Sequence, residues 1–254
     1  TDFCAVPLTV KRLMMTEEGK IFLRSLHGGV IGGASIDQSL ADFLETTRLR
    51  VGYGQTEASP GIALGEPGYF PRAHYLGRAL GCEVGKSDEQ TLLFRGANTC
   101  MGQWAPHAGF TALKPNRWHD SGDIITDESN GDLFLVGRSD SAFKLANGRR
   151  IEPEPVEDLL RSVDGGAEHL FLFSEDNEHL IVASSIPLSM NTVTIQLGSL
   201  AKLLSRIIVV PPEIFHYTPK GTLQRNATRD ALRSHMLQFD HGNDSRLYRS
   251  IRCD

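Results

Sequence analysis

The stretch from Trp118 to Glu157 limits the possible folds of this chain more than any other. Within it, Asn130-Gly131 separates two apolar runs, residues 124–125 and 133–136. Asn-Gly supplies the positive φ angles that a tight turn needs, and both runs are apolar enough to form strands. The pattern therefore predicts a β-hairpin with charged residues at the far ends of its two strands.

The chain changes character shortly after this hairpin. A second turn signal, Asn147-Gly148, leads to Pro153 between two glutamates, which is typical of a helix start. We therefore take Asp140 as the joint between two domains, the second of them α+β. The expected divisions are a first domain at residues 1–138, a small C-terminal domain at 139–238 and a polar tail at 239–254.

The residues before the hairpin predict an α/β arrangement. One or two helices are expected in residues 1–24. A short strand with glycines after it (26–35) precedes a segment with helical spacing (36–46) and a second strand (48–51). This order indicates a βαβ unit whose loops gather at one edge of a sheet. Glycine and proline then recur between short apolar runs (61–104), which favours antiparallel strands of a small barrel.

Composition argues against several classes of protein. A net charge of −5 over 254 residues gives no basic face for a nucleic acid, and no apolar run approaches the length of a membrane span. The four cysteines have no metal-like spacing, so reduced thiols and a cytoplasmic location are expected. The Gly-x-Ser-x-Gly motif of serine hydrolases and the His-Glu-x-x-His motif of zinc proteases are both absent from the sequence.

The segment Tyr53-Gly54-Gln55-Thr56-Glu57 combines side chains that suit a nucleotide. A tyrosine ring at a strand end can lie on a flat ligand, a threonine can hydrogen-bond a phosphate, and a glutamate can hold Mg²⁺ through oxygen. The same segment also fits a plain turn with an exposed acid. By itself it leaves both interpretations open.

Two charged residues at the hairpin ends and one in a late loop extend this set. Asp123 can accept both hydroxyls of a ribose, and Arg138 can reach the same sugar or a phosphate. Lys220, between proline and glycine, can neutralise charge that grows on a carboxylate and a phosphate. Taken singly, these residues also fit a solvated hairpin with charged ends and an ordinary surface lysine.

The order and spacing of these signals form a longer pattern over residues 26–232. Its motifs are Gly32-Gly33-Ala34, Gly52-Tyr53-Gly54-Gln55-Thr56-Glu57, the segments Trp118–Asp123 and Gly137–Asp140, Lys144, Asn147-Gly148, and the segment Pro219–Arg225. This pattern resembles the adenylate-forming (ANL) superfamily, which includes acyl-CoA synthetases, adenylation domains of nonribosomal peptide synthetases, and luciferases. Its forms look most similar to fungal reductase-type adenylation modules.

The resemblance implies a two-step ligase. Members of the superfamily join a carboxylate to ATP as an acyl adenylate and then pass the acyl group to a thiol of CoA or of a phosphopantetheine carrier protein. ATP or AMP, Mg²⁺, a carboxylic acid and a thiol acceptor are therefore the implied ligands. The implied fold is the C-terminal portion of a large AMP-binding domain, up to residue 138, followed by a small mobile domain.

The nucleotide pocket implied by the resemblance lies in the first domain. Gly33, Ala34 and Gly54 would belong to its lining, with the first two at the adenine and carboxylate end. Tyr53 would stack on adenine, and Thr56 would bind phosphate.

The remaining roles implied by the resemblance fall on charged residues. Glu57 would hold Mg²⁺, and Asp123 and Arg138 would bind the ribose. Asp140 would be the hinge about which the small domain swings between the half-reactions. Lys220 would bridge carboxylate and phosphate in the first of them.

Three departures from the family pattern bear on function. Ser121 stands where threonine is usual, and Thr222 occupies the usual place of the C-terminal lysine, so that Lys220 is its nearest substitute. The Ser/Thr/Gly-rich phosphate loop is not found in the sequence. We therefore expect either a truncated or split ligase that needs an N-terminal half, or an inactive nucleotide-binding or protein-interaction remnant. Apolar surface is expected to lie uncovered near residues 1–50.

Overall fold

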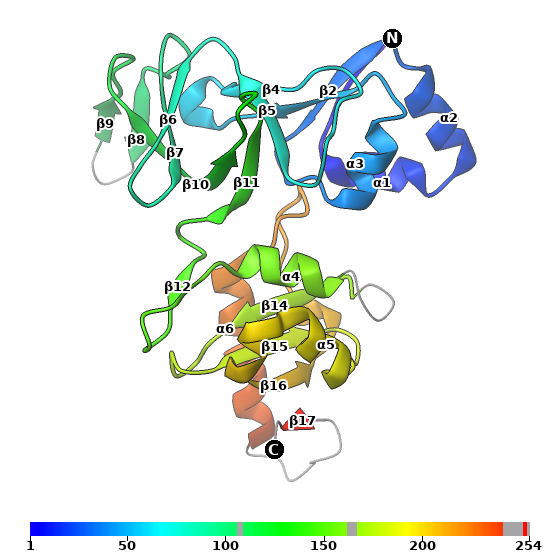
Figure 1. Ribbon diagram of the computed structural model, residues 1–254, viewed down its shortest axis with the longest axis vertical. Coiled ribbons are helices and arrows are strands. Elements are labelled where there is room, and N and C mark those ends of the chain that lie inside the picture. Colours follow the sequence, from blue (N-terminus) through cyan, green and yellow to red (C-terminus); the bar gives the residue numbers. More distant parts are fainter. Residues whose placement is uncertain (106–108, 162–166, 241–250, 253–254) are drawn as a thin grey trace. The chain divides into compact units, whose positions relative to one another are not determined.

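The computed structural model describes residues 1–105, 109–161, 167–240 and 251–252. It divides into two compact units, Thr1–Ser139 and Asp140–Asp254 (Figure 1). Most of the expected polar tail lies outside the described residues. Within the described part of the chain, no helix is long and apolar enough to cross a membrane.

The first unit begins with three parallel strands joined by helices. Each helix start has a local cause: Pro7 occupies a first-turn position, the Thr16 hydroxyl accepts from the Gly19 N–H, and the Asp37 carboxylate accepts from the Leu40 N–H. The elements are β1 (Asp2–Ala5), α1 (Pro7–Met14), α2 (Glu17–Ser25), β2 (Gly28–Gly32), α3 (Gln38–Leu44) and β3 (Arg50–Tyr53). Strand β1 lies where only helices were expected, because it forms by pairing with the distant β2.

A nine-stranded mixed sheet organises this unit, in the order β1-β2-β3-β4-β5-β11-β10-β7-β6. The antiparallel strands expected after residue 61 continue the same sheet as the parallel ones. They are β4 (Ala63–Leu64), β5 (Tyr75–Ala79), β6 (Glu83–Lys86), β7 (Thr91–Arg95), β10 (His119–Asp127) and β11 (Leu133–Arg138). A separate hairpin consists of β8 (Gly102–Ala105) and β9 (Gly109–Ala112), and a 3-10 turn, η1, covers Thr56–Ala58.

The predicted hairpin is confirmed as β10 and β11. Gly131 has a φ of +87° in the connecting turn, which is the conformation that favours glycine there. The register places Asp123 directly opposite Arg138. The two charged residues singled out in the sequence are therefore cross-strand neighbours.

The second unit packs helices on both faces of a four-stranded sheet. Leu170 and Leu172 contribute to one apolar cluster with α4 and α5, whereas Phe171 and Phe173 contribute to another with Leu232 of α6. The sheet strands are β14 (Leu170–Phe173), β15 (Leu180–Ser184), β16 (Leu204–Val209) and β17 (Ile251–Arg252). The other elements are β12 (Phe143–Lys144), β13 (Arg150–Ile151), α4 (Pro153–Arg161), α5 (Met190–Leu197), η2 (Gly198–Leu203), η3 (Pro212–Ile214) and α6 (Arg225–Asp240).

Two local expectations for this unit have different outcomes. The Asn147-Gly148 turn is present between β12 and β13, with Gly148 at a φ of +81°. The sequence predicts an amphipathic helix over residues 193–204, but helix α5 ends earlier, at Leu197, because Gly198 takes a φ of +52° and Leu204 begins strand β16. Helical spacing in the sequence had continued across η2, whose 3-10 turns keep a similar period.

Candidate functional site

Three of the predicted site residues meet in the first unit. The Tyr53 hydroxyl donates to Oδ2 of Asp123 at 2.5 Å, and Nη1 of Arg138 donates to Oδ1 of the same carboxylate at 2.8 Å. Asp123 is 8% exposed, so the hydrogen bonds from these two partners replace most of the water around its carboxylate. Burial raises the pKa of Tyr53, and the adjacent Asp123 charge raises it further, so this phenol is a hydrogen-bond donor at neutral pH.

Asp123 occupies a bulge inside β10, whereas the sequence suggested the start of a strand. Between Asp120 and Ile124 the register against β7 shifts, so Ser121-Gly122-Asp123 protrudes from the ladder. Gly122 takes a φ of +72°, and its carbonyl accepts from the Ser139 N–H at 2.8 Å. The bulge therefore turns the Asp123 carboxylate toward Tyr53 and Arg138.

Glycines bring two other predicted segments close together. Gly32 pairs with Gly52 across the parallel strands β2 and β3, and a Cβ at Gly32 would lie 2.2 Å from the Gly52 carbonyl oxygen. The segments that follow, Gly33-Ala34 and Tyr53-Gly54, therefore leave the sheet at the same edge. A Cβ at Gly54 would lie 1.6 Å from the Pro60 carbonyl oxygen, so this position also requires glycine.

Thr56 and Glu57 lie in the 3-10 turn that follows β3. Thr56 is exposed and Glu57 is half-buried. One oxygen of Glu57 accepts from Nε2 of Gln103 at 2.6 Å, and its backbone carbonyl accepts from the Cys100 N–H at 2.8 Å. The Glu57 side chain fits a magnesium ion, because Mg²⁺ in proteins is usually bound through one or two carboxylates together with water and phosphate oxygens.

Two predicted residues belong to the second unit. Asp140 is its first residue. Lys220 is exposed at the tip of a turn, in which the Gly221 N–H donates to the Thr218 carbonyl and the Thr218 N–H donates to the Thr222 carbonyl, each at 2.9 Å. Gly221 has a φ of +84° in this turn. The lysine is thus presented on a hydrogen-bonded loop.

Residues that the sequence did not single out support both segments. In the first unit, Thr91 and Asp120 hold the bulge. In the second, Glu157 on α4 forms two hydrogen bonds with Arg225, at 2.8 and 3.1 Å, just after the Lys220 loop. The spacing of Asp120 two residues before Gly122 is that of an Asx turn and could have been recognised. The pairing of Glu157 with Arg225 joins positions too distant for any local pattern.

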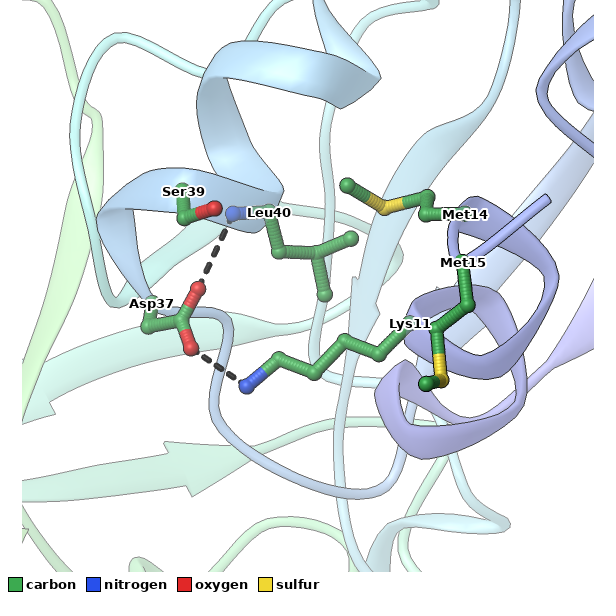
Figure 2. Close-up of a pocket in the computed structure, with 6 residues that line it drawn as sticks. All are labelled: Lys11, Met14, Met15, Asp37, Ser39 and Leu40. Carbon is green, nitrogen blue, oxygen red and sulfur yellow. Dashed lines mark hydrogen bonds and ion pairs between the residues drawn. The ribbon is translucent and has the colours of Figure 1, made fainter. Parts of the chain in front are cut away.

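A surface cavity of about 320 Å³ lies elsewhere in the first unit, between α1 and the start of α3 (Figure 2). It is lined by Lys11, Met14, Met15, Asp37, Ser39 and Leu40. Lys11 and Asp37 form an ion pair across it. None of the predicted site residues lines this cavity, so it is separate from the candidate nucleotide site.

Several known proteins are similar to this chain in sequence. No family model matches the sequence. Human long-chain-fatty-acid–CoA ligase 1 is 28% identical over 174 residues, covering 62% of this chain and 25% of the ligase. Long-chain-fatty-acid–CoA ligase 4 of Saccharomyces cerevisiae is 26% identical over 238 residues, covering 84% of this chain and 33% of that protein.

Solved structures extend the match to most of the chain. Escherichia coli MenE with a bound OSB-AMS analogue has a TM-score of 0.69 at 22% identity, covering 92% of this chain and 51% of MenE. Bacillus subtilis o-succinylbenzoate-CoA synthetase in complex with AMP has a TM-score of 0.68 at 19% identity, covering 89% of this chain and 50% of that one. The matches include acyl-CoA ligases, and none tests the closer resemblance to reductase-type modules.

The chain spans a quarter to a third of the length of these curated ligases and about half of the solved chains. Its mixed α/β fold is that of the C-terminal part of those enzymes. This chain is therefore similar in sequence to CoA ligases, and it shares the fold of the C-terminal part of solved adenylate-forming enzymes.

Proposed function

We propose that this chain carries the ribose-binding part of a carboxylate-activating ligase and works with an N-terminal half. The proposed reaction joins a carboxylic acid to ATP as an acyl adenylate and then transfers the acyl group to a thiol of CoA or a phosphopantetheine carrier. The observation that supports it is that Tyr53 and Arg138 both donate hydrogen bonds to the buried carboxylate of Asp123. Substrates of this kind fit the cytoplasmic location expected from the sequence.

The carboxylate of Asp123 has acceptor capacity left for a sugar. A carboxylate offers about four lone-pair sites, and Tyr53 and Arg138 take two of them. The two hydroxyls of a ribose can occupy the others. With its hydroxyl held by Asp123, the Tyr53 ring is fixed beside the sugar and is available to stack on adenine. Gly33, Ala34 and Gly54 would complete the pocket.

The phosphates would be handled by the segment after β3 and by the second unit. Thr56 would donate its hydroxyl to a phosphate. Glu57 would hold Mg²⁺, which supplies positive charge to the triphosphate when bound. Lys220 would place its ammonium between carboxylate and phosphate, and Asp140 would act as the hinge that allows the loop of Lys220 to leave after the first step.

Replacing Asp123 by alanine should weaken AMP binding by at least about tenfold, because the ribose loses hydrogen bonds to a charged acceptor. Isothermal titration of the full chain with AMP measures this. Asp127→Ala is the matched control, since Asp127 lies on the same strand and pairs with exposed Lys86. Equal affinity of both variants would contradict the proposed site.

An activity assay distinguishes the proposed ligase from the alternative, a catalytically inactive remnant. Pyrophosphate release from ATP with a panel of carboxylic acids, assayed with and without an N-terminal half, should occur only with the partner. If AMP binds but no acid supports release under any pairing, the chain is a nucleotide-binding remnant and the ligase proposal fails.

The partner surface is proposed on α1 and α2. Met15, Ile21 and Phe22 are 83%, 64% and 42% exposed there, at the place where uncovered apolar surface was expected. The superfamily members matched above contain about as much chain again as this one. An N-terminal half of that kind is therefore the occupant we propose for this face.

Ile21→Glu should weaken association with an N-terminal half at least about tenfold, because a charge would be buried in the apolar contact. The N-terminal half of Mycobacterium tuberculosis FadD15, a related ligase, provides a defined partner for analytical ultracentrifugation. Leu80→Glu is the control, because Leu80 is 60% exposed on a different part of the same unit. Association with no difference between the variants would contradict this surface, as would self-association of the chain through it.

A further inference from the structure

The bulge that carries Asp123 is held by a polar chain that starts on the neighbouring strand. In the register between β10 and β7, Asp120 pairs with Leu93 and Ile124 pairs with Thr91, so four steps on one strand face two on the other. Three residues, Ser121-Gly122-Asp123, therefore face only Leu92, an excess of two. A bulge of this size needs its backbone groups satisfied outside the ladder.

The Asp120 carboxylate accepts hydrogen bonds from the backbone of the bulge and from the neighbouring strand β7. Its Oδ1 accepts from the Gly122 N–H at 2.8 Å, and its Oδ2 accepts from the Thr91 hydroxyl at 2.9 Å. Thr91 is 2% exposed, and its own hydroxyl also contacts the Ser87 hydroxyl at 2.6 Å. The chain of contacts Ser87, Thr91, Asp120, Gly122 therefore runs from the start of β7 to the residue next to Asp123.

The remaining polar atoms of the bulge are also paired. The Ser121 hydroxyl accepts from the Asp123 N–H at 3.1 Å, and the Ser121 carbonyl accepts from Nη1 of Arg138 at 3.2 Å. The same Nη1 binds the Asp123 carboxylate. Nη1 of Arg138 thus contacts both the backbone of the bulge and the Asp123 carboxylate, while the Asp120 hydrogen bond holds the Gly122 N–H of the same segment.

We propose that Asp120 and Thr91 are positioning residues for ribose recognition: they fix the Ser121-Gly122-Asp123 bulge so that the Asp123 carboxylate meets both ribose hydroxyls. The inference rests on the proposed function and adds two residues to it. Asp120 and Thr91 are linked to the bulge by hydrogen bonds, from the Thr91 hydroxyl to Asp120 and from the Gly122 N–H to Asp120. Both act through Gly122, whose φ of +72° is held by the Asp120 hydrogen bond.

A comparison of two nucleotides tests this in the full chain. AMP carries both ribose hydroxyls, and 2′,3′-dideoxy-AMP carries neither. Asp120→Ala should weaken AMP binding about tenfold, the value of one hydrogen bond to a charged group, and leave the dideoxy nucleotide unchanged. Asp120→Asn should keep the preference for AMP, since its amide can accept from Gly122 and donate to the Thr91 oxygen. Thr91→Val should lose the preference and Thr91→Ser should retain it.

The outcomes distinguish this inference from the proposed function. If the native chain prefers AMP and Asp120→Ala prefers it equally, the positioning role is wrong and the proposed function stands. If the native chain shows no preference, both fail. A second readout needs no nucleotide: by NMR, exchange of the Gly122 amide should be slow in the native chain and in Asp120→Asn, and fast in Asp120→Ala. Unchanged exchange in Asp120→Ala would overturn the inference.

Discussion

Arg225→Ala should lower the free energy of unfolding of the second unit by about 3–5 kcal/mol, the cost of leaving one member of a buried ion pair alone. Glu157 is 2% exposed and also accepts from the Leu172 N–H at 2.7 Å. Arg225 donates to both Glu157 oxygens and, at 2.9 Å, to the Leu172 carbonyl. Burial raises the pKa of Glu157, and the guanidinium opposes that rise. Without Arg225, the carboxylate keeps only the more distant Arg161 guanidinium, at 3.9 Å, so it must protonate or open the unit to water.

Urea unfolding can assign this loss to one unit, because both tryptophans, Trp104 and Trp118, lie in the other. The far-UV CD transition of the second unit should shift to lower urea while the tryptophan fluorescence transition stays. Arg233→Ala, an exposed site on the same helix, is the control and should change stability by less than about 0.5 kcal/mol. A loss below about 1 kcal/mol for Arg225→Ala, the size expected for an exposed pair, would contradict the proposed contribution of this buried pair.

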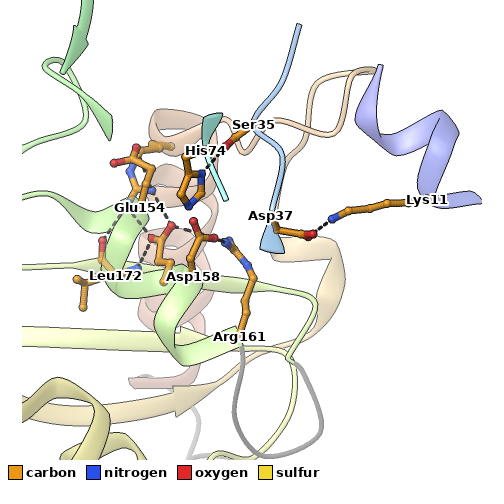
Figure 3. Close-up of polar contacts among 10 residues, drawn as sticks. Lys11, Ser35, Asp37, His74, Glu154, Asp158, Arg161 and Leu172 are labelled. Carbon is orange, nitrogen blue, oxygen red and sulfur yellow. Dashed lines mark hydrogen bonds and ion pairs between the residues drawn. The ribbon is translucent and has the colours of Figure 1, made fainter. Parts of the chain in front are cut away.

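Helix α4 also carries a second, more distant cationic neighbour of Glu157, since Nη2 of Arg161 lies 3.9 Å from Oε2 of Glu157. Arg161, one turn after Glu157 on α4, forms an ion pair with Asp158 (Figure 3). Both side chains are about one third exposed, at 33% and 30%. An exposed pair of this kind contributes about 0–1 kcal/mol, so Arg161→Ala should be far milder than Arg225→Ala in the same urea experiment.

Asp132→Ala should destabilise the first unit by about 3 kcal/mol or more, because several donors lose a shared buried acceptor. Asp132 is fully buried at the end of the hairpin turn. Its carboxylate accepts from Tyr69 at 2.8 Å, Tyr75 at 3.2 Å, Arg78 at 2.8 Å and Asn130 at 2.8 Å. The tryptophan fluorescence transition should move to lower urea here, and the control is Asp127→Ala.

The pH dependence of this effect has a defined sign. Burial, the largest influence, raises the pKa of Asp132, but the hydrogen bonds from Tyr69, Arg78, Asn130 and Tyr75 outweigh it and the pKa lies below its ordinary value. A depressed folded pKa contributes stability above the unfolded pKa, and that stability is lost as pH falls through the folded pKa. The difference in stability between the native chain and Asp132→Asn should therefore shrink below about pH 4. A constant difference down to pH 2 would contradict the depressed pKa.

Local signals predicted much of the candidate site. The Asn130-Gly131 turn set the first pairs of the hairpin, and a register shift between Ile124 and Ile125 then placed Asp123 opposite Arg138. The glycines around Tyr53 marked where strands β2 and β3 leave the sheet. These features depend on residues a few positions apart, so the sequence shows them directly. The roles assigned to all of the predicted site residues stay predictions; these residues are Gly33, Ala34, Tyr53, Gly54, Thr56, Glu57, Asp123, Arg138, Asp140 and Lys220.

Other features depended on contacts that no local pattern contains. Strand β1 exists because β2 offers it a parallel partner, although residues 1–24 suggested only helices. Helical spacing in the sequence continues past Leu197. The helix nevertheless ends there, because the chain turns at Gly198 and residues from Leu204 onward pair in the sheet as β16. The partners of Asp132 and Arg225 come from segments far away in the chain.

By itself, the sequence determined where the two marked turns lie, which segments form most of the strands and helices in each unit, and which charged side chains stand at the ends of the hairpin. Only the tertiary structure decided that Asp123 lies in a bulge, that Tyr53 shares its carboxylate with Arg138, and that Thr91 and Asp120 support it. The physical reason is that turns and periodicity come from neighbouring residues, whereas the register between β7 and β10 is set by the whole sheet.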